Sequence, residues 1–312
     1  MKYYLPLRLK GNAVAGDYSL APSTVAQVYT QIIADLTFAE ANLPLAYFTT
    51  GTTLDATSNT TRATRNSAIA LSTRVYLTKG DYASVITQAN KIVSTTAPFT
   101  AATGVPYALQ PAIANVFKTP YTTTESVFSL PFTSAETPGT QNQLATYFVL
   151  TTGEFFINTA GQLFTDPNWK TTDARRGLVK VVGTKTYSNK YPTGSPYTDW
   201  APVIRYSEVL LNLAEARANV NGVADPQAVA LLNAVRQRSD PSTVFTTATV
   251  ANILEERNIE FLGEGKRWLD IWRLDMEIPA KGATIPALPA TAPAYVWPMS
   301  GNEQVYNTLI GR

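Results

Sequence analysis

The stretch PVIRYSEVLLNLAEARANVNG, residues 202–222, decides the fold class. It predicts a helix over residues 203–219, followed by a turn at Asn221-Gly222. A second helix is predicted over residues 226–238, because the first turn of a helix tolerates the proline at position 226. The stretch is therefore the first half of a helix–turn–helix unit.

The same plan occurs earlier in the chain. Residues 68–78 and 82–93 predict two helices joined by Lys79-Gly80-Asp81. Glycine suits the left-handed position that closes a helix, and aspartate can cap the next one. Two such units with small alanines on the packing face resemble tetratricopeptide repeats. Because two copies are too few to form a solenoid alone, we expect an added scaffold.

A further helix is predicted near the N-terminus. Apolar residues recur at helical spacing from Val25 to Leu43. The Ser23 hydroxyl can accept a backbone N–H at the start of this helix, and Pro44 ends it. Residues 49–64 are rich in threonine and predict a loop.

The middle of the chain departs from the helical pattern. Residues 106–202 hold short alternating stretches, SVFSLPF at 126–132 and LVKVVG at 178–183, between turn residues and aromatics. They predict irregular loops with a few short strands. Residues 251–273 predict a long helix or a helix pair, broken near glycines 263 and 265.

These elements predict a mainly α fold, in which tetratricopeptide-like helix pairs form a scaffold beside a loop-rich region with a few short strands. We expect a single domain over residues 1–312. Within it, the helical scaffold takes residues 24–94 and 203–273, the loop-rich, ligand-side region takes 95–202, and a C-terminal wrap takes 274–312.

Composition excludes several classes of function. Lys and Arg number 25 against 23 Asp and Glu, a net charge of +2, which argues against a nucleic-acid partner because nucleic acid requires a basic stripe. Cysteine and histidine are absent, so thiolate catalysis, Ser-His-Asp catalysis and histidine-ligated metal are excluded. Metal could be held only by oxygen ligands, as calcium is, and we assign no metal-ligating residue and expect no cofactor. No apolar run approaches the roughly 18 residues of a membrane span.

Acidic residues near the C-terminal end invite a catalytic interpretation. Glu256, Glu260 and Glu264 lie four residues apart on one face of a predicted helix, and with Glu255 they could suggest the carboxylate pair of a glycosidase. Charged residues of both signs are interleaved with them: Arg257, Lys266, Arg267, Asp270 and Arg273. Alternating charge at helical spacing favours an ion-pair network, so we predict no catalytic residue.

A similar choice arises in the stretch that decides the fold. Glu208 and Glu215 lie seven residues apart on one side of the predicted helix, with Arg205 and Arg217 close by in the sequence. We expect buried or half-buried pairing that fixes helix packing.

Aromatic side chains are the remaining chemical resource, with 16 Tyr, 12 Phe and 5 Trp. Trp268 and Trp272 lie four residues apart on a predicted helix and are expected in the core. In the loop-rich region, a flat ring can stack on the apolar face of a sugar while neighbouring amides and carboxylates bind its hydroxyls. The candidate ligand-binding residues are Tyr147, Trp169, Tyr187, Tyr197 and Trp200. For each of them, packing within a loop is the alternative interpretation.

Three charged stretches carry a family resemblance. Residues 202–222, ALLNAVRQRS at 230–239 and ILEERNIEFLGEGKRWLDIWRL at 253–274 closely resemble the C-terminal signature of the SusD/RagB family. Further stretches are similar to the family's central and connecting segments: VYTQIIADLTFAEANLP at 28–44, residues 62–93, TDARR at 172–176, Lys190-Tyr191 and VWPMSGNEQVYN at 296–307.

The resemblance implies a non-catalytic, glycan-binding outer-membrane lipoprotein of Bacteroidota. It implies four tetratricopeptide-like helix pairs, with the charged motifs as scaffold and the ligand site in variable loops. It also implies a partner, a SusC-like TonB-dependent transporter over which the protein closes and to which it delivers an oligosaccharide or polysaccharide. Location would be the external face of the outer membrane, through a lipid anchor in the full-length form. Relatives usually carry a signal peptide, a lipidated cysteine and further N-terminal helices, which this sequence does not include.

Two other functions stay open at this point. A helical-repeat module could bind a protein or peptide partner without any small ligand, and its scaffold motifs would look the same. A carboxylate-dependent glycosidase that uses Glu260 is the weaker alternative.

Overall fold

The computed structural model describes residues 5–11, 16, 18–139, 142–149, 153–282 and 284–310. Its helices are joined by long irregular segments with four short strands among the described residues, which confirms the predicted fold class. Two compact units divide the chain. The larger consists of Ala39–Leu274, and the smaller of Met1–Phe38 with Asp275–Arg312.

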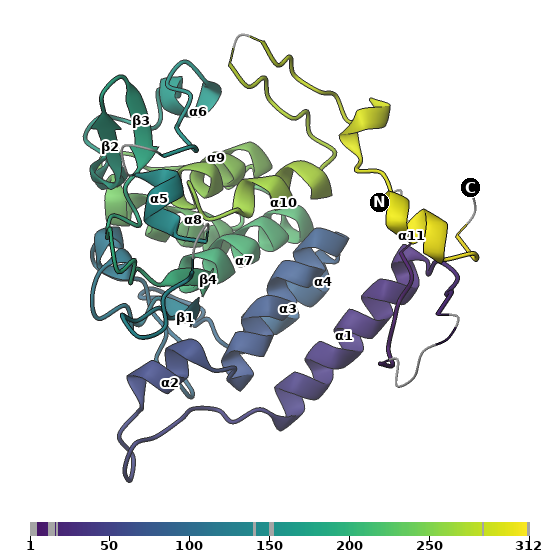
Figure 1. Cartoon of the computed structure of the whole chain (residues 1–312). Helices are drawn as coiled ribbons and strands as arrows, with labels where there is room; N and C mark the ends of the chain where they lie inside the picture. The colour runs from purple at the N-terminus through teal and green to yellow at the C-terminus, as the bar shows by residue number, and fades with distance from the viewer. Residues whose placement is uncertain are drawn as a thin grey trace. The chain divides into compact units, whose positions relative to one another are not determined.

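The larger unit contains most of the helices and all four strands (Figure 1). Its α-helices are α2 (Ala56–Thr61), α3 (Arg65–Lys79), α4 (Tyr82–Ala89), α5 (Leu144–Phe148), α6 (Gln162–Thr165), α7 (Tyr206–Asn221), α8 (Pro226–Ser239), α9 (Val250–Glu260) and α10 (Lys266–Arg273). Its 3-10 helices are η1 (Ile113–Phe117) and η2 (Ala174–Leu178). Its strands are β1 (Ser126–Leu130), β2 (Val179–Val182), β3 (Lys185–Ser188) and β4 (Ala201–Arg205).

Two helix pairs, α3–α4 and α7–α8, form as predicted because local signals set their boundaries. Gly80 closes α3 with a positive φ of 78°, a conformation that glycine adopts without strain. Asp81 then caps α4 by accepting the Ser84 N–H at 3.2 Å. In the second pair, Asp225 accepts the Ala228 N–H at 2.8 Å and Pro226 occupies the first turn of α8.

Helix α7 is the centre of the core. It packs against α3, α4, α8 and α9, so it is covered on all sides. Consecutive residues from Val209 to Leu211 are fully buried, as are Leu213 and Ala214. An apolar surface that runs around the whole helix requires this central position.

The first residues of the deciding stretch form a strand instead of the predicted helix. Val203 and Ile204 lie in β4, which pairs antiparallel with β1 and places Arg205 opposite Ser126. β-branched side chains favour extended backbone, and the ladder with β1 satisfies the backbone groups, so α7 begins only at Tyr206.

Capping residues account for two other differences from prediction. Residues 49–64 contain α2, because the Asp55 carboxylate accepts hydrogen bonds from Ser58 N at 3.0 Å and Ser58 Oγ at 2.7 Å. The first helix, α1 (Val25–Asn42), is capped by Thr24 rather than Ser23. Thr24 Oγ1 accepts the Gln27 N–H, and Gln27 Oε1 accepts the Thr24 N–H, as in a capping box.

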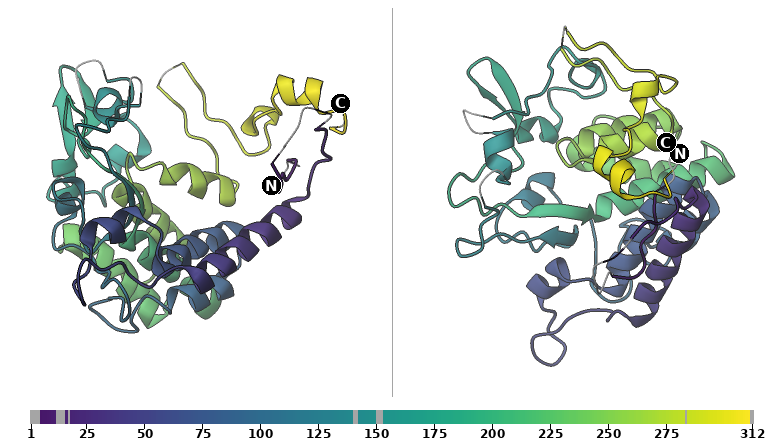
Figure 2. Two further views of the ribbon diagram at one scale, coloured as in Figure 1. Left: turned by 60° about the horizontal axis from the view of Figure 1, so that its bottom comes forward. Right: turned by 45° about the vertical axis from the view of Figure 1, so that its right-hand side comes forward.

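The loop-rich region lies on one side of the helices of the larger unit in all three views (Figures 1 and 2). It contains α5, α6 and the β2–β3 hairpin, whose register pairs Val179 with Ser188. The predicted pair of helices near the C-terminus also forms, with α9 and α10 separated by Gly263 and Gly265, both at positive φ.

In the smaller unit, the segment before α1 and the C-terminal tail are joined by hydrogen bonds. The Asn307 amide accepts the Leu20 N–H at 3.0 Å and donates to the Leu20 carbonyl at 2.9 Å. The tail also contains η3 (Pro293–Tyr295) and α11 (Gly301–Tyr306). No helix among the described residues has both the length and the apolar character needed to cross a bilayer.

Candidate functional site

The charged motifs form a buried ion-pair network, as predicted. Arg205 contacts Glu125 at 2.6 Å, Glu260 at 2.7 Å and Glu264 at 2.8 Å, and all four side chains are at most 1% exposed. Arg238 also contacts Glu125, at 2.7 Å. The network joins α9 and the segment after it to both strands of the β1–β4 sheet, because Glu125 directly precedes β1. It therefore attaches the loop-rich region to the helices.

Burial by itself would raise the pKa of Glu260, but the charges of Arg238, Arg205 and Arg175 hold it well below its usual range. The carboxylate is thus charged and surrounded by arginines. A glycosidase acid must reach its substrate, and the Glu256 and Glu260 side chains are fully covered. A substrate therefore has no access to these two carboxylates in this structure.

Glu208 and Glu215 are buried and paired, as expected, although their partners come from other elements. Arg74 of α3 and Lys266 of α10 contact Glu208, with Lys266 Nζ at 3.3 Å. Glu215 accepts from Arg273 Nη2 at 2.7 Å. The two arginines near them in sequence pair elsewhere: Arg205 in the network above, and Arg217 with Asp225 at 2.7 Å.

Trp268 is 38% exposed, which corrects the expectation that it lies in the core. Lys266, Asp270 and Ile271 take the buried face of α10. The ring centroids of Trp268 and Trp272 lie 5.4 Å apart, and Trp272 is partly buried with its indole Nε1 covered. Because Lys266 and Asp270 take part of the buried face of α10, Trp268 is left exposed.

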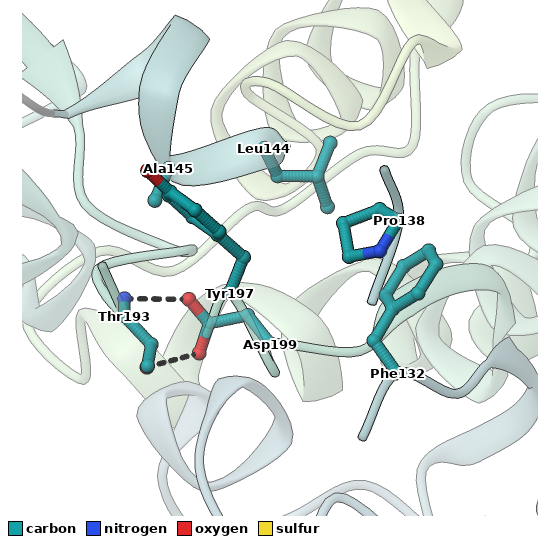
Figure 3. A pocket seen from close by; sticks show the side chains of 7 residues that line it. All are labelled: Phe132, Pro138, Leu144, Ala145, Thr193, Tyr197 and Asp199. Atoms are coloured by element: carbon teal, nitrogen blue, oxygen red, sulfur yellow. Dashed lines mark hydrogen bonds between the residues drawn. The ribbon is translucent and has the colours of Figure 1, made fainter. Parts of the chain in front are cut away.

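A small hollow opens in the loop-rich region (Figure 3). About 170 Å³ of empty space lies in and around it, including open solvent, and none of this is an enclosed cavity that could hold a water molecule. Its lining residues are Phe132, Pro138, Leu144, Ala145, Thr193, Tyr197 and Asp199. Three segments supply them: the loop after β1, helix α5 and the loop before β4.

The side chains around the hollow are arranged by chemical type. The Tyr197 ring lies on one side, and Leu144, Pro138 and Phe132 lie on the other (Figure 3). Asp199 lies beside Thr193, towards which its carboxylate is turned, and is 4% exposed (Figure 3). The hollow therefore combines an aromatic face, an aliphatic wall and one carboxylate.

Neutral donors hold the Asp199 carboxylate in place. Its Oδ1 accepts from the Tyr121 hydroxyl at 2.9 Å and from Thr193 Oγ1 at 2.7 Å, and its Oδ2 accepts the Thr193 N–H at 2.7 Å. Burial, followed by the hydrogen bond and charge of Asp199, raises the pKa of Tyr121 to about 12. The phenol therefore stays protonated and keeps donating at neutral pH.

Two tyrosines near the hollow have strained backbones. Tyr121 has φ of 63° and Tyr197 has φ of 61°. A positive φ is uncommon for any residue other than glycine, and a bulky residue is held there only when its surroundings require it. Such strain is concentrated at functional sites. The Tyr121 hydroxyl donates a hydrogen bond to Asp199, and Tyr197 lies two residues before Asp199 in the same loop.

Three of the five predicted ligand-binding residues lie in or beside this hollow. Tyr197 lines it. Trp200 directly follows Asp199, and its ring stacks on Tyr121 with centroids 5.6 Å apart and planes at 16°. Tyr147 belongs to α5, the helix that supplies Leu144 and Ala145, and it stacks on Phe155 at 5.5 Å.

The other two predicted residues, Trp169 and Tyr187, lie in the protein interior. Trp169 is 1% exposed, with the Phe164 ring at its edge and the Arg176 guanidinium carbon 3.8 Å from its ring centroid. Tyr187 is 2% exposed and donates to the Gly153 carbonyl at 3.2 Å. Protein atoms cover both rings, and neither ring lines the hollow.

Sequence reasoning missed Asp199 and Tyr121. Asp199 had a local signal, because it stands between Tyr197 and Trp200 in the loop YTDW. Tyr121 had none, since its contact with Asp199 spans 78 residues of sequence. Within the described ranges, no group of three or more His, Cys, Asp or Glu side chains is placed to hold a metal ion.

Comparison with known proteins places this architecture in a family. The SusD family profile matches residues 52–308. A SusD superfamily protein from Bacteroides fragilis has a TM-score of 0.80 at 28% identity, over 99% of this chain and 68% of that chain. A second, from Bacteroides thetaiotaomicron, has a TM-score of 0.80 at 25% identity, over 98% and 70%.

A third solved structure is surface glycan-binding protein A from Bacteroides thetaiotaomicron in complex with laminarihexaose. It has a TM-score of 0.61 at 20% identity, over 81% of this chain and 62% of that chain. No curated protein matches the chain. The profile covers most of the sequence, and it confirms the resemblance carried by the charged motifs. The chain belongs to the SusD family.

Proposed function

We propose that this protein binds glycans at the hollow, without breaking any bond in them. The observation that carries the proposal is the placement of the Tyr197 ring and the Asp199 carboxylate around one hollow opposite an aliphatic wall (Figure 3). An aromatic ring stacks on the C–H face of a sugar. A carboxylate accepts hydrogen bonds from sugar hydroxyls. The two groups together suit one sugar ring.

Family membership supports the same class of ligand. Among solved proteins of this fold is the glycan-binding protein in complex with laminarihexaose. At 20% identity that likeness concerns the fold alone, so the glycan that this chain binds is to be determined.

The hollow is shallow and partly open to solvent, with no enclosed volume large enough for a water molecule. We therefore place the face of one sugar unit over the hollow and its neighbours along the surface beside it. Trp200 and Tyr147, which flank the lining residues, are the side chains that we propose for those neighbours.

Isothermal titration calorimetry against a panel of neutral and acidic polysaccharides tests the proposal. We expect at least one glycan to bind and Tyr197→Ala to weaken that binding by about tenfold, or ~1.4 kcal/mol. Phe48→Ala is the matched control, because Phe48 is an exposed aromatic outside the lining set. Absence of any glycan binding contradicts the proposal, as does equal binding by both variants. Released reducing ends would contradict binding without cleavage.

From family membership we also propose the cellular role. The full-length protein is a lipoprotein on the external face of the outer membrane and delivers its glycan to a SusC-like TonB-dependent transporter. Fractionation of the source cells, followed by affinity purification in detergent, tests this role. Absence of the protein from the outer membrane, or purification without a barrel transporter, contradicts it. A bound protein partner without any glycan affinity would favour the protein-interaction alternative.

A further inference from the structure

The charge carried by the described residues that line the hollow is negative. Among the described residues that line it, Asp199 is the one charged side chain. Its three hydrogen-bond donors come from Tyr121 and Thr193, which are neutral groups. Asp199 belongs to none of the ion pairs found in the described part of the chain. Its negative charge is therefore not cancelled by a neighbouring cation.

The segment between two of the lining residues carries a second acidic side chain. Glu136 lies between Phe132 and Pro138, two residues of the aliphatic wall, and it is exposed. The remaining lining side chains are apolar or carry a hydroxyl. Because apolar walls focus the field of a buried charge, a ligand that enters the hollow meets a negative potential.

The negative charge of Asp199 decides which sugars can bind at the hollow. A neutral sugar presents hydroxyl groups, which can donate to a carboxylate that holds only acceptor atoms. A uronate or a sulfate ester presents acceptor oxygens and a negative charge instead. Placing such a group beside Asp199 sets two like charges in a poorly solvated site, which is unfavourable.

Resting on the proposed function, we propose that the hollow selects neutral sugar units and rejects uronate and sulfated ones. The neutral ring stacks on Tyr197 and donates a hydroxyl to Asp199. Tyr121 and Thr193 hold the carboxylate in position for that bond. Selectivity thus arises from an uncompensated acid that lines the hollow.

Matched pairs of oligosaccharides provide the test. The probes are laminarin oligosaccharides with their sulfated derivatives, and oligogalactose with oligogalacturonate of equal length. Calorimetry at about 0.01 M and about 1 M salt spans Debye lengths from about 30 Å to about 3 Å. We expect the neutral member of a pair to bind about tenfold or more tighter at low salt. The difference should narrow at high salt, where charge is screened.

A charge-removing variant makes the test specific. Asp199→Asn keeps the size of the side chain and should reduce the ratio of neutral to anionic affinity. Glu40→Gln removes a negative charge outside the lining set and should leave that ratio unchanged. The comparison between low and high salt uses the unaltered protein, so it tests the proposal even if the Asp199→Asn variant folds poorly.

The outcomes separate the two proposals. Equal or tighter binding of an anionic oligosaccharide, lost in Tyr197→Ala, overturns the selectivity and leaves glycan binding at the hollow intact. Absence of binding by every neutral and anionic probe overturns both proposals together.

Discussion

The Arg205 guanidinium and the Glu260 carboxylate lie 2.7 Å apart, with both side chains at most 1% exposed. One comes from β4 and the other from the last residue of α9. Through this contact, the segment that leads to the hollow is fixed to the helical scaffold, because Asp199 and Trp200 directly precede β4. The charged motifs thus fix the position of the loop that carries Asp199.

Removing the charge of Glu260 should destabilise the protein strongly. Glu260→Gln removes one of the two carboxylates that the buried Arg205 and Arg238 share, the other being Glu125, and leaves an excess of buried positive charge. We expect the free energy of unfolding to fall by about 3–5 kcal/mol, because an uncompensated buried charge is costly. Chemical denaturation followed by circular dichroism measures the change.

Lys79→Ala is the control for that measurement. Lys79 pairs with Asp81 at the surface, 3.3 Å away, and its side chain is 41% exposed. Exposed pairs contribute at most about 1 kcal/mol. Equal losses in the two variants would show that the buried network does not hold the scaffold.

Two neighbouring residues on α10 should respond differently to the same substitution. Asp270 contacts Arg257 and Arg273, each at 2.9 Å, and all three side chains are buried. Arg267 is half-buried and lies outside the ion pairs of the described residues. We expect Asp270→Ala to lower the free energy of unfolding by about 3–5 kcal/mol, and Arg267→Ala by less than about 1 kcal/mol. Urea denaturation checks both, and the reverse order would refute these pairings.

Protonation of Glu208 should contribute to the loss of folding stability in acid. Burial alone would raise the pKa of Glu208, but the charges of Arg74 and Lys266 lower it from the ordinary 4.5 to about 2. Because the folded-state pKa is the lower one, the stabilisation is present above about pH 4.5 and is lost as the pH falls towards 2. It amounts to about 3 kcal/mol.

Glu208→Gln isolates this contribution. The wild type should be the more stable protein at neutral pH, and the difference in unfolding free energy should narrow between about pH 4.5 and 2. Denaturation at a series of pH values measures it. A constant difference across this window would show that Glu208 has an unshifted pKa.

Because the backbone at Tyr197 is strained, replacing this residue should change the free energy of unfolding only slightly. Asparagine tolerates a positive φ, so Tyr197→Asn relieves strain of about 1–2 kcal/mol, which offsets the lost packing. We expect unfolding free energy to change by less than about 1 kcal/mol, while glycan binding weakens by about tenfold. Tyr187→Asn, at a buried ring in β3, should lose about 3 kcal/mol or more. Similar losses in both would show that no strain is stored at Tyr197.

Sequence predicted the helical pairs well because their signals are local. Gly80 and Asp81 mark the α3–α4 turn, and the apolar surface of α7 indicates its buried position. The strand β4 was missed, since its ladder with β1 joins distant parts of the chain. The charge spacing indicated a network, but it could not say that Arg205 contacts Glu125.

The site was less accessible to prediction. Of the predicted loop aromatics, Tyr197 lines the hollow and Trp200 directly follows Asp199, and their contact with a ligand stays a prediction. Whether a loop ring is exposed depends on what covers it, and the Arg176 guanidinium that covers Trp169 carries no sequence signal. The position of the Asp199 carboxylate depends in part on a hydrogen bond from Tyr121, which only the folded chain brings near it.

The position of a bound sugar in a crystal structure tests the central claim most directly. Crystals of this chain, soaked with an oligosaccharide that binds in calorimetry, should show a sugar ring against Tyr197 with a hydroxyl within hydrogen-bond distance of Asp199. A sugar bound on another surface, or in contact with Glu256 and Glu260, would contradict the division between a charged scaffold and a recognising hollow.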